Sequence, residues 1–144
     1  MPSKNKLDEY YMSLALRVAE LSHGRRAKVG ACLITDNDVT ILSCNGLPKQ
    51  LGNTLETVED DGSLKSLSYV VHAETNAVLK CAKEGVSVSG ATIFVTLSPC
   101  SSCAAMLASC GIKRVVYLQE YRDTKGIEVL KQCGIIVEKL NSEI

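Results

Sequence analysis

The pattern of apolar and polar positions predicts a helix and then a β-hairpin in the first third of the chain. Residues 8–22 carry apolar side chains at helical spacing. Asp8 and Glu9 suit the N-terminus of this helix, where the helix dipole favours negative charge. Two β-rich runs follow, at 29–35 and 39–45, and the short polar turn between them predicts an antiparallel pair of strands.

This regular pattern is lost over residues 46–71, a segment that we call the insertion. It contains a proline, three glycines and an acidic patch. Such a composition predicts a long loop with at most short helical pieces. Loops of this length inside a compact domain tend to be functional or mobile, so we expect the insertion to take part in function.

Strands and helices alternate over the second half of the chain, and each helical pattern stops at a glycine. Ser98 or Ser101 would cap the middle helix. Strands joined by helices run parallel, so we expect one α/β domain over residues 1–144, a three-layer α/β/α sandwich with a five-stranded mixed sheet. The expected helices are 73–85, 101–111 and 124–134, and the expected strands are 91–96, 114–118 and 135–140.

Composition and charge restrict the class of partner. Apolar residues make up 46% of the 144 residues, and 16 basic side chains balance 16 acidic ones. Proteins that hold a nucleic-acid polymer usually carry a basic excess and stacking aromatic side chains, so no such polymer is expected. No signal peptide is visible, and no apolar run approaches the roughly 18 residues of a membrane span. The local basic cluster HGRRAK, at 23–28, is either a solvated loop or a site for a small anion.

The cysteines point to a reducing compartment. There are seven, an odd number, and several lie within apolar runs. This usage favours free thiols and hence a cytoplasmic protein, with a metal site as an additional use. Buried structural thiols are the simplest interpretation of the five cysteines outside the motif discussed next, which are Cys32, Cys44, Cys81, Cys110 and Cys133.

Cys100 and Cys103 form a C-x-x-C motif directly after Pro99, at the start of a predicted helix. Helix N-termini stabilise thiolates, which suits metal binding. A redox pair is one alternative, although the motif comes late in the chain for a thioredoxin-like protein. A closed structural zinc site is another, and it would need Cys81 or Cys110 to complete four protein ligands.

His72 changes this interpretation. One histidine and two cysteines supply three ligands and leave the fourth zinc position open for water, which is the catalytic arrangement. Such a site also needs a group that moves protons without binding the metal, and Glu74 is of the right type. The combination of HAE at 72–74 with PCSSC at 99–103 matches the H-x-E and P-C-x-x-C signature of zinc deaminases.

With these motifs in view, the chain resembles the cytidine and deoxycytidylate deaminase superfamily, and within it the deoxycytidylate (dCMP) deaminases. The resemblance runs from about Tyr11 to Val137 and implies the cytidine deaminase-like fold. It rests on KVGACLI (28–34), CNGLP (44–48), HAETNAVLKCA (72–82), GATIFVTLSPCSSCAAMLASCGIKRVVY (90–117) and YRDTKGIEVLKQCGI (121–135).

The resemblance implies a role for each matching residue. His72, Cys100 and Cys103 would hold one catalytic Zn²⁺, and Glu74 would shuttle protons. The backbone around Ala73 and Ser98 would read the pyrimidine edge, and Asn45 would bind the sugar. Arg26 would take the 5′-phosphate through a charge-assisted contact, with Tyr121 close to it. Weaker candidates, for which solvated surface charge is the favoured interpretation, are Arg25, Lys28, Lys49 and Arg122.

The implied reaction is hydrolysis of dCMP to dUMP and ammonia, which supplies thymidylate synthesis. Other substrates stay open, namely dCTP, a free nucleoside or a base in tRNA, as does a non-catalytic zinc-stabilised binding module. Some phage relatives hold a second, structural zinc through histidines and a cysteine in the insertion, but residues 46–71 contain neither residue type here, so no second zinc is expected. Family members are often homohexamers, activated by dCTP and inhibited by dTTP.

Overall fold

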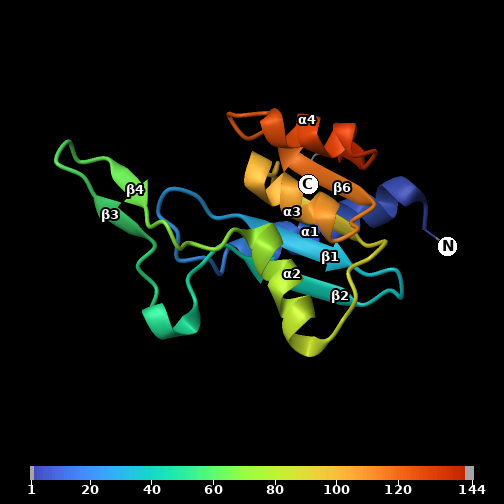
Figure 1. The fold of residues 1–144 in the computed structure, drawn as a ribbon, viewed down its shortest axis with the longest axis horizontal. Helices are drawn as coiled ribbons and strands as arrows, with labels where there is room; N and C mark the ends of the chain where they lie inside the picture. Colours follow the sequence, from blue (N-terminus) through green and yellow to red (C-terminus); the bar gives the residue numbers. More distant parts are fainter. Residues whose placement is uncertain (1, 142–144) are drawn as a thin grey trace.

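The computed structural model describes residues 2–141 as three layers, with one sheet between two layers of helices (Figure 1). The central sheet has five strands in the order β2-β1-β5-β6-β7, and a separate two-stranded sheet pairs β3 with β4. The helices are α1 (Lys4–Ala19), α2 (Ala73–Glu84), α3 (Ser101–Ser109) and α4 (Lys125–Gln132), with a short 3₁₀ helix η1 (Lys49–Leu51). The strands are β1 (Gly30–Ile34), β2 (Thr40–Cys44), β3 (Glu56–Val58), β4 (Leu64–Ser66), β5 (Thr92–Leu97), β6 (Arg114–Gln119) and β7 (Ile136–Lys139).

The sheet is mixed, as its sequence predicted. Strand β1 pairs antiparallel with both β2 and β5, whereas β5, β6 and β7 run parallel to one another. The two parallel connections are made by α3 and α4. The predicted fold class, an α/β sandwich with a five-stranded mixed sheet, is therefore confirmed.

Alternate residues of the central strands face two separate apolar clusters, as strand geometry requires. On one face, Leu33, Ile93 and Val115 pack with residues of α2, α3 and α4. On the other, Cys32 and Phe94 pack with Met12 and Ala15 of α1. The four long helices thus divide three to one between the faces, which leaves α2 and α3 side by side at the end of the sheet where the predicted ligands lie.

The first helix starts earlier than its apolar pattern indicated. It begins at Lys4 with Ser3 as its N-cap, because the Ser3 hydroxyl accepts a hydrogen bond from the Lys6 N–H. Asp8 therefore lies in the body of the helix rather than at its start. It is buried and accepts two hydrogen bonds from the Arg114 guanidinium on β6. Its charge thus serves a contact across the fold, which local sequence could not predict.

The prediction that the insertion is a loop was wrong in one respect. Strands β3 and β4 form an antiparallel hairpin within it, and the hairpin projects from the body of the molecule (Figure 1). Each strand has only three residues, too few for an alternating pattern to stand out. The 3₁₀ helix η1 is consistent with the expectation of at most short helical pieces in this segment.

No helix in the described part of the chain has both the length and the apolar character that crossing a membrane requires. That residues 1–144 form a single domain stays a prediction.

Candidate zinc and nucleotide site

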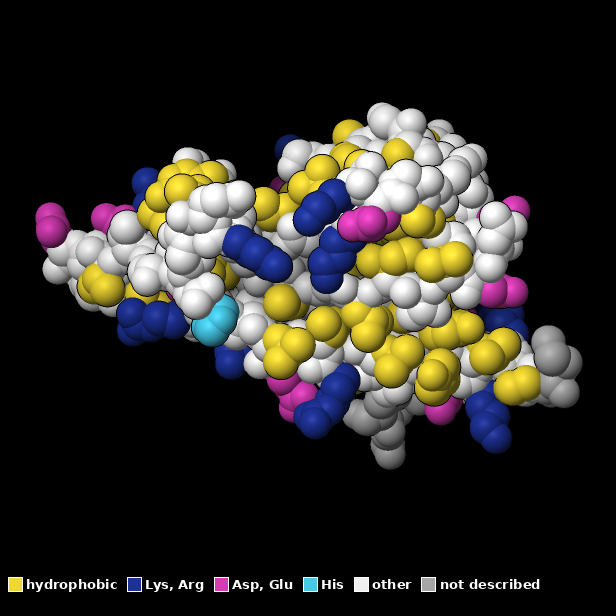
Figure 2. All heavy atoms as spheres, turned by 90° about the horizontal axis from the view of Figure 1, so that it is seen from below, with side chains coloured by type: hydrophobic (Ala, Val, Ile, Leu, Met, Phe, Trp, Pro, Cys, Tyr) yellow, Lys and Arg dark blue, Asp and Glu magenta, His cyan; other side chains and the backbone are white. Residues whose placement is uncertain are grey.

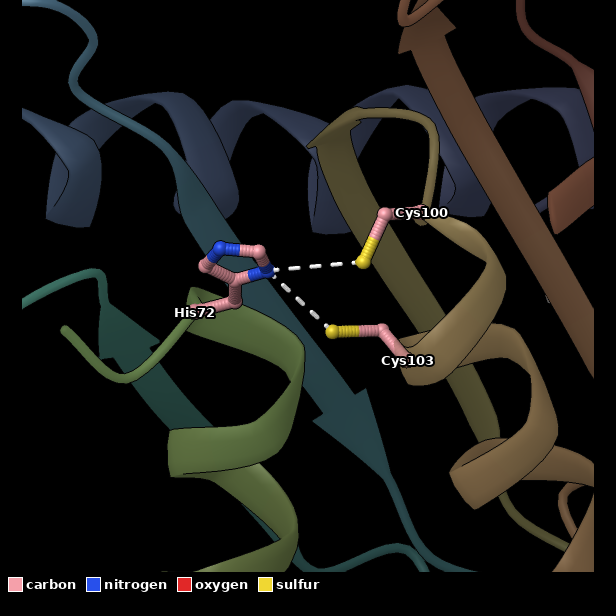
Figure 3. A group of neighbouring side chains, drawn as sticks. All are labelled: His72, Cys100 and Cys103. Carbon is pink, nitrogen blue, oxygen red and sulfur yellow. Dashed lines mark hydrogen bonds between the residues drawn. The ribbon is translucent and has the colours of Figure 1, made fainter. Parts of the chain in front are cut away.

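Two helix N-termini meet at the predicted metal site. His72 is the N-cap residue of α2 and Cys100 is the N-cap residue of α3, and neither side chain caps its own helix. The predicted caps of α3, Ser98 and Ser101, were therefore both wrong. Cys103 lies in the first turn of α3, and its sulfur and that of Cys100 point toward the same nitrogen of His72 (Figure 3).

The three side chains fit a zinc ion. Nδ1 of His72 lies 3.2 Å from the Cys103 sulfur and 3.7 Å from the Cys100 sulfur. Ligands on a tetrahedral Zn²⁺, with Zn–S of about 2.3 Å and Zn–N of about 2.0 Å, stand roughly 3.6 Å apart. Among residues 2–141, these three are the only cluster of three or more potential metal ligands, and their ligand atoms all lie within 4.8 Å of one another. The donor set and its spacing match a three-ligand zinc site.

Further polar groups complete the surroundings of the two sulfurs. The Thr75 hydroxyl lies 3.5 Å from the Cys103 sulfur, and the Ser102 hydroxyl lies 3.3 Å from the Cys100 sulfur. Burial, followed by the charge of Glu74, raises the pKa of the Cys103 thiol. A dication offsets that cost by stabilising the thiolate. Cys81 and Cys110 lie outside the group, so a closed site completed by either is not formed.

Glu74 is buried beside the metal ligands. It lies in the first turn of α2, is 3% exposed, and places Oε1 3.9 Å from Nδ1 of His72. Burial raises the pKa of this carboxyl to about 7, although hydrogen bonds from Cys103 and its own backbone N–H act in the opposite direction. A carboxyl with a pKa close to neutrality can both accept and release a proton at physiological pH.

A cavity of about 260 Å³ opens directly over this group. Seen from below, the molecule is hollowed between the lobe that carries the insertion and the rest of the body (Figure 2). All the predicted site residues except Cys103 line the cavity, and residues of the insertion form part of its wall. The predicted substrate-binding residues that it brings together are Arg26, Asn45, Ala73, Ser98 and Tyr121.

The polar groups of Asn45 and Ser98 are already partly engaged. The Asn45 amide accepts from the Val29 N–H and donates to the Ala27 carbonyl, so it holds the basic loop. The Ser98 N–H donates to Gln119, and its hydroxyl accepts from the Tyr121 N–H. The carbonyl of Ser98 is thus the backbone group left for a ligand, and a carbonyl suits an amine donor.

Two residues of the insertion were missed by sequence reasoning. Glu56 and Ser66 line the cavity and contact the basic loop at Arg26. Both are common surface residue types in a segment without a periodic pattern, so only the hairpin pairing could have pointed to them. Of the weaker basic candidates, Arg25, Lys28, Lys49 and Arg122, none lines the cavity.

Comparison with known proteins agrees with this geometry. Residues 5–119 match the family model described as the cytidine and deoxycytidylate deaminase zinc-binding region. The chain belongs to this deaminase family. The family model is a zinc-binding region, and the histidine and two cysteines described above form a site that fits one Zn²⁺.

Individual relatives in the family are similar over most of their length. The deoxycytidylate deaminase of Mycobacterium phage D29 is 35% identical over 128 residues, which cover 82% of this chain and 98% of that protein. The mouse deoxycytidylate deaminase is 33% identical over 81% of this chain and 67% of its own. A crystal structure of dCMP deaminase from cyanophage S-TIM5 in complex with dCMP and dUMP is 39% identical, with a TM-score of 0.86 and coverage of 96% and 99%.

Proposed function

We propose that the protein is a zinc-dependent deaminase that hydrolyses dCMP to dUMP and ammonia. One cavity is lined by the buried carboxyl of Glu74, by the guanidinium-bearing Arg26 and by His72 and Cys100, two of the three residues that form the zinc site, and this combination supports the proposal most strongly. The similarity to phage and mouse deoxycytidylate deaminases supports the same substrate. The product, dUMP, would supply thymidylate synthesis.

His72, Cys100 and Cys103 would hold the zinc ion, which would lower the pKa of a bound water toward neutrality and so make it a nucleophile toward C4 of the cytosine ring. Glu74 moves the protons. It accepts one from the water and delivers it to N3 of the ring, and it then carries the proton of the hydroxyl now on C4 to the leaving amine as the C4–N bond breaks and ammonia leaves. Its burial excludes competing solvent, and its raised pKa suits both directions of transfer.

The remaining residues select the substrate. The backbone of Ala73 and the carbonyl of Ser98 would read the pyrimidine edge, and Asn45 would bind the sugar; all three residues line the cavity. Arg26, which also lines the cavity, takes the 5′-phosphate, because a guanidinium fork matches phosphate geometry. Tyr121, whose backbone N–H donates to the Ser98 hydroxyl, would lie near the same phosphate.

Two alternative functions have less support. A deaminase acting on dCTP, a free nucleoside or a tRNA base would use the same zinc chemistry. A free nucleoside has no phosphate for the arginine that lines the cavity, and the similar phage and mouse proteins are deoxycytidylate deaminases, which favours dCMP over dCTP or a tRNA base. A non-catalytic zinc module has no use for Glu74, since burying an unneeded carboxyl beside a metal costs stability.

We also propose a cytoplasmic location, a homohexameric assembly and control by dCTP and dTTP. The first is supported by seven free cysteines, because free thiols persist in reducing compartments. The other two rest on family resemblance.

One experiment separates these possibilities. Purified protein is assayed on deoxycytidine, dCMP and dCTP, each with and without dCTP or dTTP as effector, and zinc and molar mass are measured on the same sample. The proposal requires the highest kcat/KM on dCMP. A higher kcat/KM on deoxycytidine would contradict it.

A further inference from the structure

One cross-strand pair in the insertion holds Arg26 at two points. Glu56 on β3 and Ser66 on β4 are directly opposite each other in the hairpin register. The Glu56 carboxylate accepts a hydrogen bond from the Arg26 N–H at 3.0 Å, and the Ser66 hydroxyl accepts one from the Arg26 guanidinium at 3.2 Å. One cross-strand pair of the hairpin therefore holds both the backbone and the side chain of Arg26.

The Glu56 contact has a second component. The same carboxylate oxygen accepts the Arg25 N–H at 2.8 Å. Two consecutive backbone N–H groups that converge on one point form an anion-binding concavity, and here Glu56 fills it. An anion entering the cavity then meets the Arg26 guanidinium rather than the backbone N–H groups of the loop.

The hairpin itself is anchored next to this pair. Leu55, which precedes Glu56, is 2% exposed, and its carbonyl accepts the Leu67 N–H at 2.8 Å. Glu56 is also buried, at 8% exposed. The contacts to Arg26 thus come from the fixed base of the hairpin, while residues toward its tip, such as Val58, are exposed.

We propose that Glu56 and Ser66 are positioning residues that preorganise Arg26 for the phosphate group of the substrate. Ordering an arginine side chain costs conformational entropy. If other contacts already order Arg26 in the free protein, less entropy is lost on binding, and the phosphate is bound more tightly. The insertion would then set the preference for a nucleotide over a nucleoside. This inference rests on the proposed function, in which Arg26 takes the 5′-phosphate.

The test uses the zinc-loaded protein with Glu56→Ala, Glu56→Gln and Ser66→Ala, and compares dCMP with deoxycytidine. Positioning predicts that Glu56→Ala raises KM for dCMP about tenfold, with kcat nearly unchanged and no change in KM for deoxycytidine. Glu56→Gln should restore most of the affinity, because its amide oxygen can accept the same N–H groups. Ser66→Ala, which leaves the backbone contacts intact, should raise KM for dCMP by a smaller factor.

A double-mutant cycle separates positioning from general support of the fold. If Glu56 acts through Arg26, Glu56→Ala should add nothing to KM for dCMP in an Arg26→Ala background. Additive effects, or equal effects on dCMP and deoxycytidine, would overturn the proposal.

Binding measurements keep this test independent of turnover. Glu74→Gln, loaded with zinc, is titrated calorimetrically with dCMP and deoxycytidine, with and without Glu56→Ala. If Glu56→Ala abolishes the preference for dCMP over deoxycytidine, the positioning role is supported. This holds even if the wild-type protein does not turn over dCMP, because absent turnover would contradict only the proposed function. Equal affinities for the two ligands before the substitution would defeat the positioning role.

Discussion

Oε1 of Glu74 lies 3.9 Å from Nδ1 of His72, the same nitrogen that faces both cysteine sulfurs. A carboxyl in this place adjoins the metal site without being needed as a ligand, because three donors already converge there. It is therefore positioned to exchange protons with a molecule in the fourth zinc position.

Glu74→Gln should abolish turnover while zinc content and fold are retained. The amide keeps the size of the carboxyl but cannot accept and release a proton, so kcat should fall by at least about 10²-fold to 10⁴-fold. Steady-state kinetics and zinc analysis on the same sample check this. Retained turnover with normal zinc content would show that another group moves the protons.

Arg26→Ala should raise KM for dCMP far more than KM for deoxycytidine, because only dCMP carries the phosphate. Arg25→Ala is the matched control. Arg25 is adjacent in sequence, but within residues 2–141 its side chain makes no hydrogen bond or ion pair, and it lies outside the cavity lining. The account predicts little change for Arg25→Ala, and a similar loss in the two variants would point to the general charge of the loop instead.

Gly126→Ala should weaken the zinc site from a distance. A Cβ at this position would lie 2.0 Å from the Pro99 carbonyl oxygen, so α4 or the loop before Cys100 must shift. Alanine favours a helix over glycine by about 1 kcal/mol, but overpacking of this kind typically costs about 1–3 kcal/mol. We expect a lower Tm and lower zinc occupancy. Gly46→Ala is the control, because its Cβ would meet nothing within 4 Å; equal losses in both variants would refute the steric explanation.

The Glu138 carboxyl should contribute stability that disappears in acid. A hydrogen bond from Arg114, helped by Lys4, lowers the pKa of Glu138, although burial acts in the opposite direction. A folded-state pKa below the unfolded one gives stability that is complete above the unfolded pKa, whose ordinary value is 4.5, and is lost as pH falls through the lowered value. Because the side chain is 39% exposed, the contribution should not exceed about 1 kcal/mol.

Urea unfolding of wild type and Glu138→Gln between neutral pH and about pH 3 measures this contribution, since glutamine cannot ionise. The difference in unfolding free energy should shrink as pH falls. A difference that stays constant over the whole range would mean that the ionised carboxylate has no part in it.

The sequence predicted the metal-binding and proton-transfer residues of the site, but not the long-range contacts that support it. His72, Glu74, Cys100 and Cys103 lie at two helix starts whose positions follow from apolar periodicity, and metal ligands are few in kind, so their pattern is specific. Asp8, Glu56 and Ser66 behave differently. Asp8 pairs with Arg114, 106 positions away, and Glu56 and Ser66 gain their place only from a hairpin of three-residue strands. Such long-range pairings leave no trace in local periodicity.

Removing and restoring zinc shows whether dCMP hydrolysis depends on the metal. Zinc is stripped with a chelator and restored to one ion per chain, and formation of dUMP and ammonia from dCMP is measured at each stage. The account predicts that activity is lost with the metal, returns with it, and yields dUMP and ammonia in equal amounts. Full activity in the stripped protein, or no dUMP from the reloaded protein, would contradict it.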